Sequence, residues 1–431
     1  MRYTNRRGGR ITALVAGMLT FVAVVSGCGA TANTSSSSSA GGSAQSQASG
    51  SAASGSPIVI GTIGSQTGPG SIGNTGNGPA IDQAWAKWLN AHGGINGHPV
   101  KVITFDDTGD PAVGLQMAKE LVQDKAIADV GPISTVQTAF SSYLEQHGIP
   151  IIGGNFYNTD ILTNSLNFPS GTVLPADQLA VLGLAKKLGF KNVGFVYCAE
   201  APICTAQVAT YEEDAKILGG IKFTPIAKVT ATQPSYTPEC IAMQNDKVDL
   251  ILPGLAGPTI IRLLADCRQE GFNAPLIDEA ANIQPNWLTT SALNNTYLIG
   301  GDISYFDDSV PGVQQYNEEL QTYAPQALTN PEHGETDFQT WVGFKLFEAA
   351  AKAGGIGPNS TPADLINAMY KINGTTLGGL TVPLTFVKGQ VNFESCYYSE
   401  QIVSGKLVML NGSKTTCLTP AEVAALKSET N

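Results

Sequence analysis

The alternation of short apolar runs with longer amphipathic runs is the feature that most constrains how this chain folds. In residues 57–152 it predicts strands and helices in turn: Pro57–Ile63, Ala80–His92, Val100–Phe105, Ala112–Asp124, Ala128–Val130, Thr138–His147 and Pro150–Ile152. The first, third, fifth and seventh are the strands. Strands that alternate with helices form parallel sheets covered by helices on both faces.

A second series of the same kind follows a Pro- and Gly-rich break at Pro169–Pro175. Its predicted helices are Gln178–Leu188, Ala206–Leu218, Thr237–Gln244 and Thr259–Glu270, and its predicted strands are Val193–Tyr197, Lys222–Lys228, Leu250–Pro253 and Leu276–Ile277. Two series predict two sheets, and the length from about Pro57 to Leu426 suits two domains better than one.

The last third of the chain departs from this rhythm. It predicts a strong helix at Phe338–Ala353 that ends at Gly354-Gly355, then a helix at Pro362–Tyr370 and short strands around Leu384–Val387, Tyr397–Val403 and Leu407–Met409. A chain that completes its first domain after visiting its second would end in this way. We therefore predict one lobe from 57–170 with 306–378, and another from 171–305 with 379–426.

The N-terminus reads as an export signal. A basic segment with Arg2, Arg6, Arg7 and Arg10 precedes an apolar run at Ile11–Val25. About 15 apolar residues are fewer than the roughly 20 that a membrane-spanning helix needs. Val25-Ser26-Gly27-Cys28 resembles a bacterial lipobox, which implies cleavage before Cys28 and a lipid on its thiol; an ordinary secretory cleavage site is the alternative. Residues 1–27 are thus the predicted signal peptide.

Residues 28–56 are predicted to be a tether. From Ala30 to Pro57 the chain is nearly all Ser, Ala, Gly, Gln and Thr without charge, which is typical of a flexible linker with a mean span of roughly 30 Å. Loss of residues 1–27, with their four arginines, takes the formal net charge from −11 to −15. So acidic a chain disfavours nucleic acid as a partner, and the lipid on Cys28 is its expected link to the membrane.

Six cysteines remain after Cys28, and in an exported protein they favour three disulfides, although fifteen pairings are possible. We favour neighbours in sequence: Cys198–Cys204, Cys240–Cys267 and Cys396–Cys417. A zinc site is the rival interpretation, but the spacings are not CxxC and the four histidines lie away from the cysteine pairs. We expect no metal and no cofactor.

Several motifs in the first 70 residues after the linker occur in a distinctive order. They are Thr67-Gly68-Pro69, the run Gly93 to Gly97, Asp106-Asp107 and Asp110-Pro111. This segment resembles the start of type I periplasmic solute-binding proteins, in the branched-chain amino-acid (Leu/Ile/Val) binding family of ABC transporters. The run HGETDFQTWVGFKLFEAAAKAG resembles that family's penultimate helix. The resemblance implies two Rossmann-like lobes, each a parallel sheet with helices on both faces, joined by crossover hinge segments.

The same motifs have local structural roles. Gly93 and Gly94 suit the end of a helix, Asn96-Gly97 a tight turn, and Asp110-Pro111 the cap and first residue of the next helix. Gly68 to Gly73 also matches the dinucleotide pattern G-x-G-x-x-G. Nucleotide binding is disfavoured there because further glycines follow and no helix begins directly after the turn.

Ligands of open parallel sheets bind outside the carboxyl ends of the strands, so two facing lobes would enclose a cleft. The candidate ligand-binding residues lie in the loops at those ends: Gln66, Ile72, Ser134, Thr135, Asn155, Phe156, Tyr157, Glu200, Leu255, Asp278 and Glu279. The resemblance places a carboxylate-binding hydroxyl at Ser134 or Thr135; capping of the next helix is the alternative. Asp278 or Glu279 would pair with an ammonium group, or else lie in an exposed turn. The family's aromatic residue in the first loop is replaced by Ile72, which leaves amino-acid specificity open.

These features predict an extracytoplasmic solute-binding lipoprotein, anchored to the bacterial cell membrane. It would be a monomer that captures a small polar solute, an amino acid or related amide or acid, and delivers it to the permease of an ABC importer with its ATPase. A receptor subunit that signals to a membrane partner is the alternative. An exported enzyme is disfavoured because the chain lacks G-x-S-x-G, H-E-x-x-H and a Cys/His pair with a free thiol, so no catalytic residue is predicted.

Overall fold

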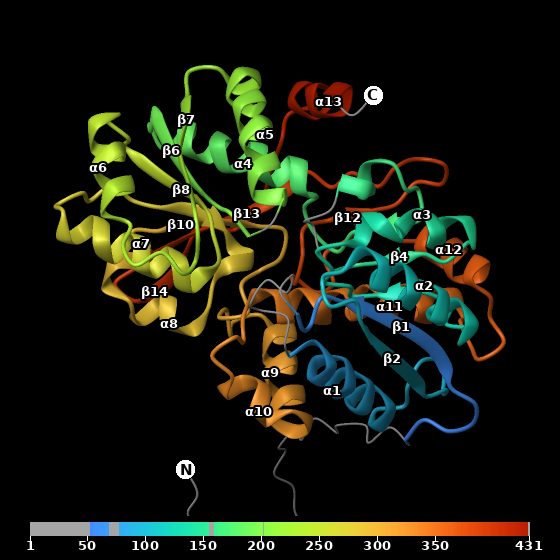
Figure 1. Ribbon diagram of the computed structural model, residues 1–431. Coiled ribbons are helices and arrows are strands. Elements are labelled where there is room, and N and C mark those ends of the chain that lie inside the picture. Colours follow the sequence, from blue (N-terminus) through green and yellow to red (C-terminus); the bar gives the residue numbers. More distant parts are fainter. Residues whose placement is uncertain (1–51, 69–76, 155–158, 201, 430–431) are drawn as a thin grey trace, which may run out of the picture. The chain divides into compact units, whose positions relative to one another are not determined.

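The computed structural model describes residues 52–68, 77–154, 159–200 and 202–429 (Figure 1). The predicted signal peptide, Cys28, Ile72 and the run from Asn155 to Tyr157 lie outside the described residues. Residues 49–431 form one unit, and two groups of elements within it are each built on a sheet. The predicted boundaries of the two lobes remain predictions.

The first sheet is parallel throughout, with the strand order β2-β1-β3-β4-β5. Its strands are β1 (Ile58–Gly64), β2 (Val100–Asp106), β3 (Asp129–Val130), β4 (Ile151–Ile152) and β5 (Asn167–Phe168). The helices associated with it are α1 (Gly78–Ala91), α2 (Pro111–Gln123), α3 (Ser141–Gln146), α9 (Pro311–Tyr323), α10 (Pro325–Thr329), α11 (Glu335–Gly354) and α12 (Pro362–Met369).

Alternation along β1 explains how this sheet is covered on both faces. Ile58 and Ile60 pack in the cluster that contains Trp85 of α1 and Phe344 of α11, whose rings stack at 4.6 Å. Ile63 packs instead with residues of α2 and α3. Every second side chain of β1 therefore faces the same pair of helices, and α11 returns from late in the sequence to cover the first sheet.

The second sheet begins with the parallel order β7-β6-β8. A parallel bridge between Ile251 and Leu276 adds β9, which pairs in parallel with β10; β13 and β14 then extend the sheet antiparallel. These strands are β6 (Asn192–Cys198), β7 (Lys222–Val229), β8 (Leu250–Gly254), β9 (Ile277–Glu279), β10 (Tyr297–Gly300), β13 (Cys396–Val403) and β14 (Lys406–Ser413). Short strands β11 (Asn373–Thr375) and β12 (Leu384–Thr385) pair with each other, and β15 (Thr416–Cys417) pairs with β13.

Helices cover the second sheet in two pairs, as its buried clusters indicate. Helices α4 (Leu174–Lys187) and α5 (Pro202–Leu218) share a cluster with Phe195 and Leu252, whereas α6 (Thr237–Asn245) and α7 (Gly257–Gln269) share one with Val196 and Ile251. Residues 195 and 196 are neighbours on β6 whose side chains face opposite sides. The predicted α/β class with parallel sheets and helices on both faces is confirmed. The remaining helices are α8 (Pro285–Thr289) and α13 (Pro420–Glu429).

Three chain segments between the two groups meet at Thr381. Its hydroxyl donates to the backbone oxygen of Ser170 and, at 3.1 Å, to that of Gly301. Tyr398 of β13 donates its hydroxyl to the Thr381 oxygen at 3.1 Å. Gly301 admits this approach because a Cβ there would lie 2.1 Å from the nitrogen of Thr172. The segments that run between the sheets are therefore hydrogen-bonded to one another.

Most predicted elements match the structure within a few residues. Helix α4 begins at Leu174, four residues before the predicted start, because Pro175 is tolerated in a first helical turn. The helix predicted at Thr138–His147 is wrong as a continuous element, since Phe140 interrupts it with φ −125° and ψ −13°. The elements that were not predicted from the sequence include β5, β10, β11, β15, α8, α9, α10 and α13.

The predicted local motifs of the first sheet are confirmed. Asp110 accepts hydrogen bonds from the nitrogens of Ala112 and Val113 and so caps α2. Asn96 and Gly97 have φ of 52° and 87°, and the backbone groups of Ile95 and His98 bond across this two-residue turn. These contacts satisfy backbone groups that an abrupt turn would otherwise leave unpaired.

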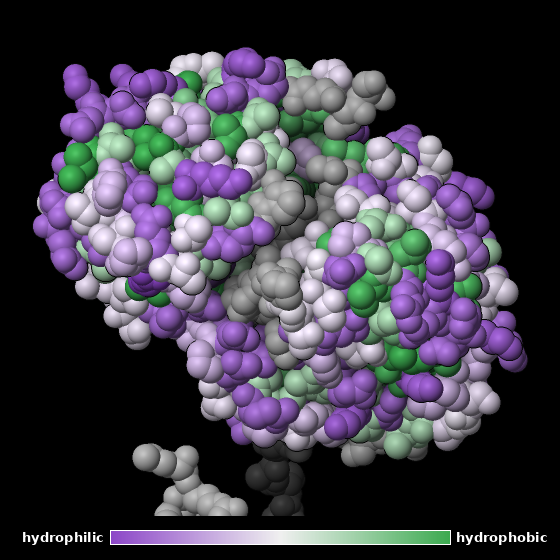
Figure 2. Space-filling model, in the orientation of Figure 1, coloured by the Kyte–Doolittle hydropathy of each residue, from purple (hydrophilic) through white to green (hydrophobic). Residues whose placement is uncertain are grey.

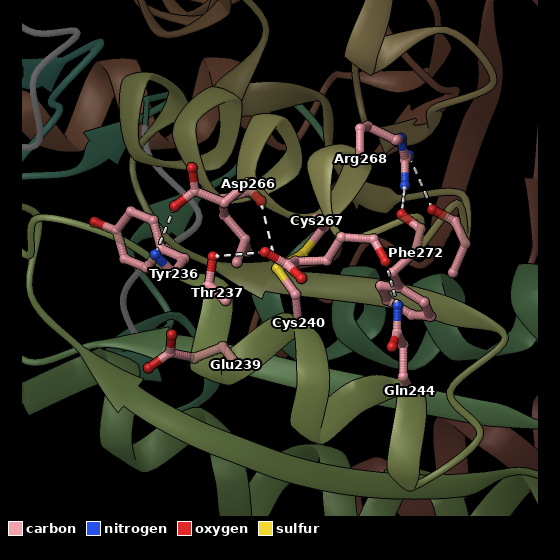
Figure 3. Close-up of a disulfide and its surroundings, with 12 residues drawn as sticks. Tyr236, Thr237, Glu239, Cys240, Gln244, Asp266, Cys267, Arg268 and Phe272 are labelled. Carbon is pink, nitrogen blue, oxygen red and sulfur yellow. Dashed lines mark hydrogen bonds between the residues drawn. A yellow bond between two sulfur atoms is a disulfide. The ribbon is translucent and has the colours of Figure 1, made fainter.

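All three predicted disulfides are present: Cys198–Cys204, Cys240–Cys267 and Cys396–Cys417. Figure 3 shows the second, which joins α6 to α7. Hydrogen bonds flank it: Asp266 accepts from the nitrogen of Tyr236 at 2.6 Å, and Gln244 donates to the backbone oxygen of Glu270 at 3.0 Å. The last turn of α7 is thus held along the length of α6, covalently at Cys240 and by hydrogen bonds on either side of it.

Candidate functional site

The loops after β1 and β3 are bonded together at the carboxyl edge of the first sheet. The Ser65 hydroxyl donates to Asp107 Oδ1 at 2.6 Å and lies 3.1 Å from Thr135 Oγ1. The Thr135 nitrogen donates to Ser65 Oγ at 2.9 Å, and the Ser65 nitrogen donates to the Ile133 oxygen at 2.8 Å. Ser65 therefore connects two loops that the sequence separates by 70 residues.

Ser134 and Thr135 differ in exposure. Ser134 is fully buried, and its Oγ accepts a hydrogen bond from the nitrogen of Val136 at 3.1 Å, just before the 3₁₀ turn at Gln137–Ala139. The contact closes a turn within the loop; the 3₁₀ turn itself has Val136 as its N-cap residue and no side-chain cap, so the capping alternative is not confirmed for Ser134. Thr135 is partly exposed and lies at the edge where strands β1 and β3 end. Of the two, Thr135 is the one that a molecule outside this edge can reach.

The loop after β4 depends on glycine because α11 packs directly on it. Gly153 has φ +68°, and a Cβ there would lie 2.2 Å from Gly343 Cα. Gly154 has φ +79°, and its Cβ would lie 2.1 Å from the Pro132 oxygen. The backbone of α11 therefore lies directly against the backbone at the strand end, and this fixes the position of Gly153.

A small cavity lies at the same edge, between the sheet and the first turns of α1 and α11. Its lining residues are Thr62, Gly64, Gln66, Gly78, Asp82, Gly131, Ile133, Thr336, Asp337 and Thr340. Its volume of about 10 Å³ is close to what one water molecule needs. Gln66, a predicted ligand residue, is half-buried in this wall. The acids were not predicted, because a lone Asp inside an amphipathic helix gives no local signal.

The two acids of the cavity wall are held by different partners. Asp82 Oδ2 accepts a hydrogen bond from Thr104 at 2.6 Å, and Asp82 Oδ1 has no hydrogen-bond partner among the described residues. Asp337 Oδ2 accepts from Asn77 at 2.9 Å and lies 3.0 Å from His333 Nδ1. Burial raises the pKa of Asp82 to about 7, and the nearby Asp337 adds to that increase.

In the second sheet, Asp278 and Glu279 end strand β9 and are 2% and 7% exposed, so the alternative of an exposed turn is wrong. Asp278 accepts from the nitrogen of Glu279 at 2.9 Å and from Asn282 at 3.1 Å. Burial raises the pKa of Glu279 to about 7, although a hydrogen bond from Tyr211 lowers it. Burial also raises the pKa of Asp177, with Glu279 and Asp278 as the next causes. Asp177 and Tyr211 thus interact with the two predicted acids, although neither residue was predicted to lie at the site.

The other two predicted residues of the second group, Glu200 and Leu255, differ in exposure. Glu200 is exposed, and its carboxylate accepts hydrogen bonds from the nitrogens of Ala199 and Ala231 at 3.1 and 2.7 Å. It therefore braces the loop that the Cys198–Cys204 disulfide closes. Leu255 is buried and belongs to the hydrophobic core.

The side chains at both edges form hydrogen bonds and carry buried carboxyl groups. Within the described ranges, no group of three or more His, Cys, Asp or Glu side chains could hold a metal ion. The helices that the structure describes include none long and apolar enough to span a membrane. On the face that Figure 2 shows, hydrophobic side chains occur in small groups among hydrophilic ones.

Comparison with known proteins identifies a family and relatives that are all named as binding proteins. A family described as periplasmic binding protein matches residues 57–406. An amino acid binding protein of Pseudomonas aeruginosa is 34% identical over 239 residues, which are 54% of this chain and 63% of that protein, so the match spans less than two thirds of it. A leucine-specific-binding protein of Salmonella typhimurium is 21% identical over 75% of this chain and 86% of its own length.

Solved structures share the fold at low identity. A branched-chain amino-acid ABC transporter protein of Thermus thermophilus with bound valine has a TM-score of 0.73 and 16% identity, covering 85% of this chain and 98% of its own. An ABC transporter solute-binding protein of R. palustris in complex with benzoate has a TM-score of 0.66 and 16% identity, covering 85% and 98%. A fatty acid ABC transporter substrate-binding protein of Thermomonospora curvata has a TM-score of 0.69 and 18% identity, covering 87% and 95%.

Proposed function

Because this chain belongs to the periplasmic binding protein family, we propose that it is an extracytoplasmic solute-binding lipoprotein of an ABC importer. It captures a small polar solute between its two lobes and delivers it to the permease. Two findings together support the proposal. The family matches residues 57–406, and polar side chains lie at the carboxyl ends of parallel strands, where ligands of such sheets bind.

The polar groups at these edges favour an amino acid or a related amide or acid as the solute. Thr135 offers a partly exposed hydroxyl beside the ends of β1 and β3, and Glu279 offers a buried carboxyl at the end of β9. A hydroxyl suits a carboxylate or amide oxygen, and an ionised Glu279 suits an ammonium group. The names of the relatives mention different ligands: leucine, valine, benzoate and fatty acid. Membership of the family therefore does not identify the solute, and the proposal of an amino acid, amide or acid is based on the side chains at the two edges.

A thermal-shift screen tests solute capture. Protein unfolded to strip bound ligand and refolded with its disulfides intact is screened against amino acids, amides and small organic acids. A solute present at 100 times its dissociation constant stabilises the native state by about 2.7 kcal/mol, which raises Tm by several degrees. Absence of a shift with every compound would count against solute capture.

Two substitutions then test the site with the solute so identified. Thr135→Val removes a hydroxyl with little change of shape, and we expect at least a tenfold loss of affinity because a hydrogen bond to a charged group contributes about 1.5–3 kcal/mol. Thr289→Val, at an exposed position of the second group, is the matched control and should bind normally. Equal affinity of all three proteins would remove Thr135 from the site.

The anchoring and delivery steps have their own test. In cells, Cys28→Ala should release the protein from the membrane fraction while the solute affinity of the purified folded part is unchanged. Uptake of the labelled solute should require both the anchored protein and the permease. Intact uptake in a permease deletion, with altered signalling on addition of solute, would favour a sensing receptor instead.

A further inference from the structure

The wall of the cavity beside Gln66 offers hydrogen-bond acceptors. The hydroxyl of Thr62 donates to the Val130 oxygen at 2.8 Å, and that of Thr340 donates to the Gly131 oxygen at 3.2 Å. A hydroxyl has one hydrogen, so the oxygens of these two threonines can only accept within the cavity.

Asp82 adds an acceptor that is costly to leave unpaired. The residue is fully buried, its Oδ2 is bonded to Thr104, and its Oδ1 has no partner in the described part of the chain. A buried carboxylate oxygen without a partner loses the full solvation of that atom. An occupant that supplies positive charge or hydrogens to Asp82 Oδ1 therefore stabilises the fold.

The charges around the cavity also favour a cation. Asp337, which lines the wall with Asp82, is 2% exposed and bonded to His333, the basic group of this network. Asp129, on the neighbouring strand, is fully buried and carries another unpaired oxygen, Oδ2, among the described residues. Burial raises the pKa of all three acids, and a cation beside them would favour their ionised forms.

From this geometry we propose that the cavity lined by Asp82, Asp337, Thr62, Thr340 and Gln66 binds one small monovalent cation of the size of Na⁺. The volume of about 10 Å³ admits a single ion or water-sized body. Carboxylate and hydroxyl oxygens are ligands of hard cations. A monovalent ion is favoured because the cavity has no room for the several waters that Mg²⁺ usually keeps, or for the roughly six to eight oxygens that Ca²⁺ takes.

Such an ion would join three elements that meet at the solute edge. Asp82 lies on α1, Thr340 on α11, and Thr62 on β1 beside the loop that carries Ser65. The proposal does not depend on the identity of the solute or on delivery to a permease. It concerns the stability of the edge from which the first group would contact a solute.

The test is the melting temperature of the ligand-free protein at pH 8 and constant ionic strength, with choline chloride replaced stepwise by NaCl, LiCl or KCl. We expect Tm to rise saturably with Na⁺, by about 3 °C or more at 0.5 M, and less with K⁺, because a site this small excludes the larger ion. At pH 5.5 the Na⁺ effect should shrink, since protons compete for Asp82.

Asp82→Asn should abolish the difference between Na⁺ and choline. Glu400→Gln is the matched control and should keep the Na⁺ response. Like Asp82, Glu400 is buried and has an unpaired carboxyl oxygen among the described residues, Oε1, but it lies on β13 and does not line the cavity. If Asp82→Asn does not fold, the comparison of Tm in NaCl and KCl with the natural protein tests the proposal: an equal rise of Tm with Na⁺ and K⁺ would contradict a site of this size. Equal Tm in NaCl and choline chloride at pH 8, or an undiminished response in Asp82→Asn, would overturn the proposal.

Discussion

At the scale of single residues, Gly153 is a position where the fold leaves no room for a side chain. Its φ is +68°, and a Cβ added there would lie 2.2 Å from the backbone of Gly343, so two separate penalties combine. We expect Gly153→Ala to lower the free energy of unfolding by about 3–5 kcal/mol, from left-handed strain and from the forced shift of α11. Gly148→Ala, at φ +68° with no atom within 4 Å, should cost only about 1 kcal/mol. Urea unfolding of both variants measures the difference; similar costs would mean that α11 moves freely.

The same scale separates what the sequence predicts from what it does not. Asp110 before Pro111 predicted its own cap, since the hydrogen bonds of a cap are formed within three residues. Asp82 and Asp337 escaped notice because their significance arises from partners up to 260 residues away, as in the bond from Asn77 to Asp337. Local chemistry is readable from local sequence, whereas a cavity is made by elements that the sequence keeps apart.

At the scale of elements, the pairing of α6 with α7 rests on the Cys240–Cys267 disulfide (Figure 3). The crosslink closes a separation of 27 residues, against 6 for Cys198–Cys204, so the chain-entropy account assigns it about 3.6 kcal/mol and the shorter one about 2.2 kcal/mol. The double replacement Cys240→Ala/Cys267→Ala should therefore destabilise more than Cys198→Ala/Cys204→Ala in denaturant titrations. Both Cys240 and Cys267 are fully buried, so the loss of packed sulfur adds to the difference. An equal or reversed order would show that the longer crosslink restricts little in the unfolded chain.

The periodicity of the sequence does not predict how strands pair, and it does not reveal very short strands. The sequence predicted the strands β13 and β14 and placed residues 379–426 in the second lobe, but nothing in these strands indicates that β13 pairs antiparallel with β10 and β14 with β13. Strands β3, β4 and β5 have two residues each, too few for a period to emerge, so β5 was missed. Their position is fixed by neighbours: β4 pairs with β3 on one side and with β5 on the other.

At the scale of the whole molecule, the family and the two-sheet class were predictable because they depend on the order of many motifs and strands, and the match over residues 57–406 confirms the family. The positions of the buried acidic side chains could not be predicted from the sequence. Burial raises the pKa of Asp82, Glu279 and Glu319 to about 7 and that of Asp302 and Glu400 to about 8. A sequence with a net charge of −11 indicates an acidic surface, and it does not reveal that a set of its acids lies inside.

These raised pKa values make stability depend on pH in a definite direction. A carboxyl whose pKa is higher in the folded protein than in the unfolded chain binds protons more strongly when folded, so its contribution is complete below about pH 4 and is lost as pH rises through 7 to 8. We expect the free energy of unfolding to fall steadily from pH 5 to pH 8.5 in urea titrations with choline chloride as the salt. Asp302→Asn/Glu400→Gln should flatten this slope above pH 7, whereas Glu213→Gln, which removes an exposed ion pair with Lys216, should leave it unchanged. A constant or rising free energy of unfolding over this range would mean that the buried acids are ionised in the folded protein and that other groups offset their charge. If Na⁺ restores stability at pH 8, the part of the pH dependence that is due to Asp82 reflects the proposed cation site, left empty in choline chloride.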